Sequence, residues 1–393
     1  MRPSPAFATA AVLGCSYLPG SFAWGAAGHE IVATIAQMYL HPSVLPTVCD
    51  ILDLPNGRCH MASVATWADQ HRNQMRWSAA LHYIGALDDY PSQTCAFPGP
   101  RGWAGRQGIN VLDGIQNTTN LLLDWVNEDT SDMVANEALK FLIHFVGDMH
   151  QPLHLTGRDR GGNSVKVRFG SRQTNMHSLW DGFLIAKAVR TVPRNYSRPL
   201  PYPKIEKALR GTIYDSYIRR IMWEGLLNPW ADDAAEWLSC ASPVEATEPA
   251  AASGLLTMWQ AAYRTTSKIV QAVLRDGVEI TPDGPVVCPH HWAQPLHQLN
   301  CDIIWPKELD EPPFNVRFDS GAHFHTGNEE EEDHTDLAGA ALLDLDTPEY
   351  AGVIEKQMIV EKLLAQGGIR LAGVLNYLFA HEDKDFGLFV MNM

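Results

Sequence analysis

Most of the chain carries apolar residues at the three- and four-residue spacing that is typical of amphipathic helices. This spacing runs from His29 to Tyr39, directly after a small-residue segment, and recurs five times. Gly161-Gly162-Asn163 precedes the run Val165 to Phe169, which predicts a strand in a small hairpin. The sequence therefore predicts a mainly α fold, a single multi-helix domain with one small β-hairpin. The other predicted helices cover residues 106–126, 135–149, 205–226, 253–275 and 349–380.

One long segment lacks such a period. Residues 281–348 are rich in proline and contain an acidic run, Glu329 to Asp333. So long a stretch without elements is unusual inside a compact domain, so we interpret it as a surface excursion held by cysteines. It carries His323, His325 and His334, for which a solvated loop is a better explanation than a metal site.

The first residues predict a secretory signal peptide. Arg2 precedes an apolar stretch from Ala6 to Leu18, and Ser21-Phe22-Ala23 is a small-x-small cleavage site. The alternative is a disordered or core-bound N-terminus. No later segment is long and apolar enough to span a bilayer, so we expect no membrane span. The prediction is a signal peptide over 1–23 and one domain over 24–393, with irregular insertions at about 195–290 and 306–347.

Charge and cysteine content narrow the classes of function. The net charge of −15 argues against a broad basic face that holds duplex, but not against an enzyme whose metal ions supply positive charge locally. Exported chains with an even number of cysteines commonly form disulfides, although six cysteines permit fifteen pairings. Sequons at Asn117 and Asn195 fit export. The cysteines left after cleavage are Cys49, Cys59, Cys95, Cys240, Cys288 and Cys301.

Candidate metal chemistry is concentrated around residues 144–181. His144 and Asp148 are four residues apart and share one face of a helix. Pro152 should end that helix, after which His154 projects from another direction. His177 and Asp181 repeat the four-residue spacing. Imidazole and carboxylate together suit zinc, and two such pairs predict a metal site, although a single pair is also common as a surface hydrogen bond.

Three other places offer ligands, and each alone is better explained by packing. Asp69 follows a large aromatic residue, and His82 lies among apolar residues, where a histidine is commonly a satisfied core residue. His29 lies five residues from Trp24, the predicted new N-terminus.

Taken together, these residues resemble a known family in order and spacing. The family is the secreted zinc-dependent single-strand nucleases and 3′-nucleotidases of the mung bean nuclease type, with the bacterial zinc phospholipases C as more distant relatives. The resemblance covers Trp24 to about Asp181 and resumes at Trp292–Cys301 and Ile369–Asn376. The matching motifs are Trp24…His29, Trp67-Ala-Asp69, His82-Tyr-Ile, His144…Asp148…His154, Gly161-Gly-Asn163 and His177-Ser-Leu-Trp-Asp181.

The resemblance implies three zinc ions at the base of a cleft. Asp69, His82 and His144 would hold one zinc, with Asp148 bridging to a second. The second would take His29 and the α-amino nitrogen and carbonyl oxygen of Trp24, which form a free chelate only after cleavage. His154, His177 and Asp181 would hold the third.

The resemblance also implies catalytic and substrate-binding roles. Asp69 and Asp148 would act through the metals. Arg72, where family members commonly carry lysine, would stabilise the equatorial oxygens of the transition state; a surface arginine is the alternative. Tyr83 would stack on a base, and the turn of Gly161 and Asn163 would read its edge.

One position of the substrate site departs from the family. Gly85 stands where the family's acid is expected, so either Asp88 or Asp89 reaches the base or the base preference differs.

The resemblance implies a long-range disulfide between Cys95 and Cys301. The remaining cysteines are then expected as Cys49–Cys59 and Cys240–Cys288.

The expected function is that of a secreted, monomeric zinc endonuclease. It would cut single-stranded DNA and RNA to 5′-nucleotides, act as a 3′-nucleotidase, and have no stable membrane association. A zinc phospholipase C is the enzymatic alternative and predicts an apolar, membrane-facing rim. A secreted zinc-binding protein without catalysis is the other, although a purely structural site needs no bridging carboxylate or open coordination position.

Overall fold

The computed structural model describes residues 24–55, 59–240, 283–284, 286–317 and 341–380. These residues form a mainly helical fold with one small hairpin, as the sequence predicted. The predicted signal peptide, the predicted helix over 253–275 and the histidines at 323, 325 and 334 lie outside the described residues.

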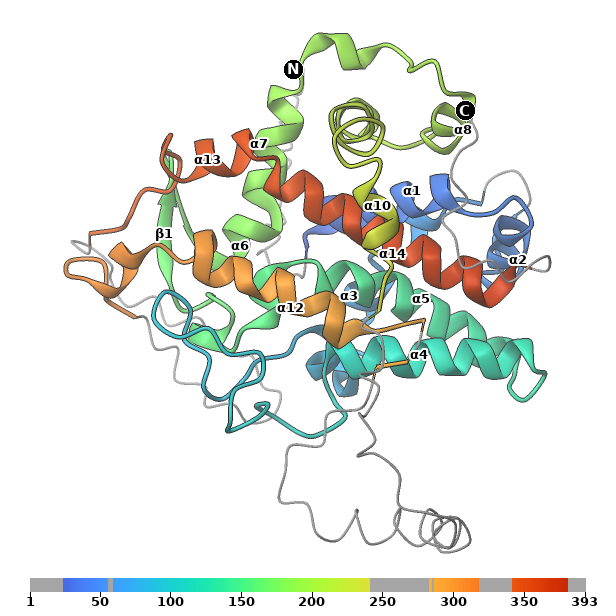
Figure 1. The fold of residues 1–393 in the computed structure, drawn as a ribbon, viewed down its shortest axis with the longest axis horizontal. Coiled ribbons are helices and arrows are strands. Elements are labelled where there is room, and N and C mark those ends of the chain that lie inside the picture. The colour runs from blue at the N-terminus through green and yellow to red at the C-terminus, as the bar shows by residue number, and fades with distance from the viewer. Residues whose placement is uncertain (1–23, 56–58, 241–282, 285, 318–340, 381–393) are drawn as a thin grey trace, which may run out of the picture.

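Four long helices form the centre of the core. Helix α14 (Ile359–Phe379) packs against both α1 (Ala26–Tyr39) and α5 (Asp132–Met149), and α4 (Val111–Val126) packs along α5. Figure 1 shows α14 crossing the middle of the molecule, with α4 and α5 side by side beneath it. Because α14 and α5 bury most of their surface, their apolar residues are spread around the helix rather than confined to one face.

Local signals set the ends of the central helices. The Asn110 side chain accepts hydrogen bonds from the backbone N–H groups of Leu112 and Asp113 and so begins α4. Helix α5 ends at Met149, shortly before Pro152, as predicted. The turn η3 (Pro152–Leu155) then redirects the chain. As a result, the end of α5 and the turn η3 lie on the same side of the core.

The predicted hairpin is present. Strands β1 (Lys166–Phe169) and β2 (Arg172–Asn175) pair antiparallel, with Phe169 opposite Arg172 next to the turn. The chain then enters α6 (Met176–Ser178), the π-helical turn η5 (Leu179–Phe183) and α7 (Leu184–Thr191). The remaining elements are α2 (Val44–Ile51), η1 (Met61–Val64), α3 (Trp67–His71), η2 (Arg76–His82), η4 (Arg158–Arg160), η6 (Arg194–Ser197), α8 (Pro203–Ala208), α9 (Asp215–Ile221), η7 (Met222–Leu226), α10 (Asp233–Glu236), α12 (Pro289–Leu299), η8 (Asn300–Ile304), η9 (Lys307–Asp310) and α13 (Ala351–Lys356).

Two predicted helices are interrupted. The segment 205–226 divides into α8, α9 and η7, and the turn before α9 contains Gly211 at a φ of 89°. The segment 349–380 divides into α13 and α14 at Met358, whose φ is 51°. The apolar period continues across both breaks, which is why the pattern alone joined the helices.

The prediction of a surface excursion over residues 281–348 is wrong for its first part. Helix α12 buries Trp292, Ala293 and Leu296 in the core. Its Pro289 stands in the first helical turn, where a missing N–H costs nothing. This segment is therefore part of the packed domain.

Three disulfides join the pairs expected from the sequence, Cys49–Cys59, Cys95–Cys301 and Cys240–Cys288. Within the part of the chain that the structure describes, no helix is both long and apolar enough to cross a membrane.

Candidate metal centre

Helix α5 supplies the centre with its first two side chains. His144 and Asp148 are fully buried and lie one helical turn apart, with His144 Nε2 3.4 Å from Asp148 Oδ2. His144 Nδ1 lies 2.8 Å from the carbonyl oxygen of Ala65. Because a carbonyl only accepts, Nδ1 carries the proton and Nε2 faces the centre. Asp69, at the start of α3, lies 3.6 Å from that Nε2 atom.

Helix α1 brings His29 against the same turn of α5. Its ring stacks on that of His144 with 3.9 Å between centroids. This approach requires Gly147, because a Cβ at that position would lie 2.5 Å from His29 Nδ1. The small residue before Asp148 is thus what allows the two helices to present histidines to one centre.

His82 and His154 lie in the 3₁₀ turns η2 and η3, each of which is followed by extended backbone. His154 Nδ1 donates to the carbonyl oxygen of His82 at 2.6 Å, and the backbone N–H of Ile84 donates to the carbonyl oxygen of His154 at 2.7 Å. The two segments continue side by side to Gly85 and Gly157. A Cβ on Gly85 would lie 2.4 Å from the nitrogen of Gly157, so only glycine permits this approach. The departure from the family's acid therefore has a structural basis.

The third ligand pair follows the hairpin. His177 and Asp181 lie on the α6–η5 turn, with His177 Nε2 3.3 Å from Asp181 Oδ2. His177 Nδ1 donates to the carbonyl oxygen of Gly161 at 2.7 Å. The ring of His177 stacks on that of His154 at 5.0 Å, which joins this pair to the rest of the centre.

Gln151 was not identified from the sequence. Its Nε2 atom donates to Asp181 Oδ1 at 2.6 Å, which leaves Oδ2 directed toward the centre. The signal was its place between Asp148 and Pro152, in the same short segment as the predicted ligands. Such an outer partner orients a ligating carboxylate.

The N-terminal end of the described chain packs against the same carboxylate segment. The backbone N–H of Gly25 donates to the carbonyl oxygen of Asp181 at 2.8 Å. Trp24 is fully buried beside Gly28. The structure thus brings Trp24 to the edge of the centre.

Asp148 connects the histidines. Its Oδ1 atom lies 3.4 Å from His29 Nε2, whereas its Oδ2 atom lies 2.9 Å from His82 Nδ1. One carboxylate therefore faces two different sets of imidazoles, which is the arrangement of a bridging ligand.

Compact groups of potential ligand atoms result. The third group is the ligand set that the resemblance implied, whereas the first places His29 with Asp69 rather than with Trp24. A separate group of Asp89, Cys95 and His297 includes a cysteine that is held in a disulfide. The groups at the centre are His29, Asp69 and His144; His82, His144 and Asp148; and His154, His177 and Asp181.

Unpartnered buried atoms show that the centre fits a metal. Buried polar atoms are almost always hydrogen-bonded, so a cluster of orphans requires an explanation. Nitrogen and carboxylate oxygen are donors that zinc accepts. The unpartnered atoms here are both nitrogens of His29, Nε2 of His82, Nε2 of His154, Oδ1 of Asp148 and Oδ2 of Asp181.

The electrostatics of most of these groups agree with this fit. His144 differs, because burial opposes its protonation but the carboxylates of Asp148 and Asp69 raise its pKa to about 9. Burial lowers the pKa of His29 to about 4 and that of His177 to about 3, so both imidazoles are neutral donors at physiological pH. Burial opposes ionisation of Asp148, but His144 together with His29 and His82 holds its pKa well below the usual range. Burial and the charge of Asp148 raise the pKa of Asp181 well above the usual value. A cation at the centre would offset the cost of ionising Asp181.

The predicted substrate residues lie around the centre. Tyr83 follows His82 in extended conformation and is 41% exposed. Burial raises its pKa, against the opposing charge of Arg160. Asn163 is partly exposed, and its amide donates to the carbonyl oxygen of Arg160. Arg72 caps the C-terminal end of α3 and is half-buried, three residues beyond Asp69.

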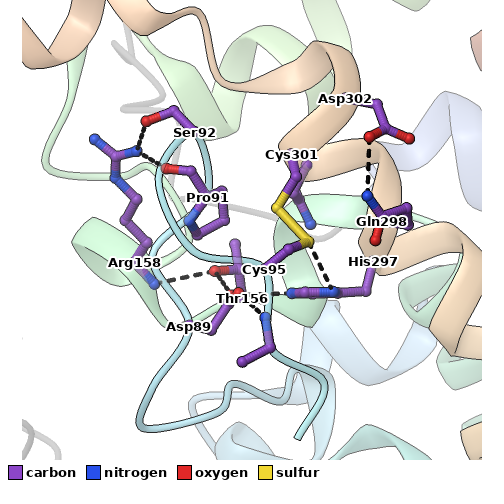
Figure 2. The surroundings of a disulfide bond; sticks show 12 residues. Asp89, Pro91, Ser92, Cys95, Thr156, Arg158, His297, Gln298, Cys301 and Asp302 are labelled. Atoms are coloured by element: carbon purple, nitrogen blue, oxygen red, sulfur yellow. Dashed lines mark hydrogen bonds and ion pairs between the residues drawn. A yellow bond between two sulfur atoms is a disulfide. The ribbon is translucent and has the colours of Figure 1, made fainter. Parts of the chain in front are cut away.

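The two acids offered as substitutes at Gly85 have other partners. Asp89 is buried, accepts a hydrogen bond from Thr156 and lies 3.0 Å from His297 Nε2 beside the Cys95–Cys301 disulfide (Figure 2). Asp88 binds the backbone and side chain of Arg101. Asp89 is thus enclosed by the fold, whereas Asp88 is partly exposed.

Comparison with known proteins decides the family. Residues 24–318 match the family model described as S1/P1 Nuclease. The chain belongs to the S1/P1 nuclease family. Endonuclease 3 of Arabidopsis thaliana is 31% identical over 376 residues, which cover 93% of this chain and 92% of that protein. Nuclease S1 of Aspergillus oryzae is 37% identical over 163 residues, 41% of this chain and 54% of that protein. Nuclease P1 of Penicillium citrinum is 38% identical over 168 residues, 42% of this chain and 60% of that protein.

Membership of this nuclease family supports a hydrolase that acts on phosphodiester bonds. The asparagines of both predicted glycosylation sequons are exposed, Asn117 in α4 and Asn195 in η6.

Proposed function

We propose that this S1/P1 nuclease is a secreted, zinc-dependent endonuclease that holds three zinc ions. It cuts single-stranded DNA and RNA to 5′-nucleotides and also removes 3′-phosphates. The observation that carries the proposal is Asp148, whose two oxygens face separate sets of histidines within a centre of unpartnered buried donors. The disulfides support export, because such bonds persist in oxidising compartments. We expect a monomer.

The chain's own residues would divide the work of metal binding. Asp69, His82 and His144 would hold one zinc, and Asp148 would be shared with a second that His29 and Trp24 would also hold. His154, His177 and Asp181 hold the third. Zinc in such a cluster lowers the pKa of water toward neutrality and neutralises charge on phosphate oxygens.

Positioning falls to the residues around these ligands. The carbonyl oxygens of Ala65, His82 and Gly161 fix the Nδ1 protons of His144, His154 and His177, so that each ring presents Nε2.

Residues at the edge of the centre would bind the substrate. Tyr83 stacks on a base, and the turn of Gly161 and Asn163 contacts its edge. Arg72 stabilises the equatorial oxygens of the phosphoryl group. Single-stranded substrates suit this arrangement because their bases are free to stack on an aromatic ring.

The test is a chelator-and-rescue assay on the mature secreted protein. Single-stranded DNA, RNA, a 3′-nucleotide and phosphatidylcholine are offered in parallel. We expect cleavage of the first three, loss of activity with chelator and recovery with zinc. The Asp148→Asn variant should stay inactive at any zinc concentration. Hydrolysis of the lipid alone, or nuclease activity that survives complete metal removal, would overturn the proposal.

A further inference from the structure

A cavity of about 690 Å³ adjoins the candidate metal centre on the side of Asp181. Its walls are the hairpin turn around Gly170, the turn η5 and helix α7, and Asp346 lies beside both the hairpin turn and α7. Figure 1 shows the hairpin and α7 at the same end of the molecule, and Phe169 and Phe183 join them by an edge-on ring contact at 6.2 Å. The volume lies in the range of roughly 300–1,000 Å³ that is usual for ligand sites.

Cations dominate these walls. Arg172 leaves the hairpin turn, and Lys187 and Arg190 lie on one face of α7, three residues apart. Two carboxylates, Asp181 and Asp346, line the same cavity. Asp346 forms an ion pair with Lys187 at 2.7 Å, and Asp181 directs its free oxygen toward the metal centre.

Two positive charges remain without compensation. Among the described residues, no carboxylate forms an ion pair with Arg172 or Arg190, and both side chains are exposed. The chain as a whole carries a net charge of −15, which repels a polyanion. Two arginines next to the centre create a local positive potential that attracts an anionic ligand, although the net charge of the chain is negative.

We infer that this cavity, with Arg172 and Arg190, is a subsite for the phosphates that flank the scissile bond of a single nucleic-acid strand. The inference rests on the proposed function. Because Asp181 lines the cavity and also belongs to the metal centre, a strand whose scissile phosphate lies at the centre would pass beside the cavity. Arginine is suited to the task, since its planar guanidinium binds two phosphate oxygens at once. Free phosphate has the same chemistry, so the test separates the two.

The experiment measures kcat/KM of the mature zinc-loaded protein from 50 to 200 mM salt. The substrates are a twelve-nucleotide single strand and a dinucleoside monophosphate, which has no flanking phosphate. Each phosphate contact with a single strand contributes about 0.7 to the slope of log affinity against log salt. The Arg172→Gln/Arg190→Gln variant should therefore reduce the slope for the strand by about 1.4. Between 50 and 200 mM salt, its kcat/KM should then fall about sevenfold less than that of the wild type. For the dinucleoside monophosphate the change should be less than half of that.

Two control variants accompany the test. Arg168→Gln removes a hairpin cation that pairs with Asp344 and is outside the cavity lining, so it should leave the slope unchanged. Arg172→Lys/Arg190→Lys keeps both charges and should restore most of the slope. Zinc content is measured for every variant.

The outcomes distinguish the inference from the proposed function. Wild-type protein that cleaves neither substrate would refute the proposed function. Wild-type protein that cleaves both would refute only the subsite if the double glutamine variant keeps the full slope, or if Arg168→Gln lowers it equally. Altered inhibition by inorganic phosphate, without a change of the strand's slope, would also overturn the subsite.

Discussion

Gly85 offers the sharpest test of how the centre is built. Its close contact with Gly157 holds the segment of His82 against that of His154. A Cβ on residue 85 would lie 2.4 Å from the nitrogen and 2.7 Å from the Cα atom of Gly157. Both contacts are with backbone, so no side-chain rotation relieves them, and the segments must separate.

The size of the effect follows from this overlap. Forcing an extra carbon into a packed site costs about 1–3 kcal/mol. In a chain of this size we expect Gly85→Ala to lower Tm by about 1–4 °C. Moving His82 away from His154 also weakens metal binding, by roughly 10- to 100-fold.

The assay combines scanning fluorimetry in excess chelator with a competitive zinc titration. Chelator isolates the packing cost, and the titration reports the geometry of the ligands. Gly157→Ala is the matched control, because its Cβ would have only an ordinary contact of 3.8 Å with the Cα atom of Gly85. If the two variants show equal Tm and equal zinc affinity, the proposed role of this contact is wrong.

Three further changes test other parts of the account. Gln151→Ala frees Asp181 Oδ1 and should weaken zinc binding or activity about 10- to 100-fold, measured by titration and by rescue with excess zinc. Tyr83→Ala should weaken binding of single strands by about 1–3 kcal/mol, measured by fluorescence anisotropy, while zinc content stays constant; equal binding would remove its stacking role. Burial raises the pKa of Glu361 in the folded state, so the folded protein binds this proton more tightly and loses stability as pH rises from 4.5 through that raised value. Glu361→Gln keeps the acceptor for Tyr217 and should remove this loss, so its Tm relative to wild type should increase from pH 4.5 to 8; a constant difference would contradict the argument.

Local rules explain what the sequence predicted well. The helical period placed His144 and Asp148 on one face, and Pro152 ended the helix, because both effects act within a few residues. The same rules joined α13 to α14, since the left-handed conformation of Met358 has no signature in its residue type.

Long-range packing explains what the sequence did not predict. The prolines of α12 suggested an irregular segment, whereas burial of Trp292 stabilises a helix there. The contact between Gly85 and Gly157 joins residues far apart in the chain, so the pattern showed a missing acid but not its steric cause. Asp89 likewise is bound by partners from other segments.

We propose that one buried carboxylate, Asp148, joins two zinc sites within a three-zinc centre. Anomalous diffraction at the zinc edge from crystals of the mature protein would locate these ions. We expect three peaks, two of them on opposite oxygens of Asp148 and the third between His154, His177 and Asp181. A single peak, or peaks remote from Asp148, would contradict it.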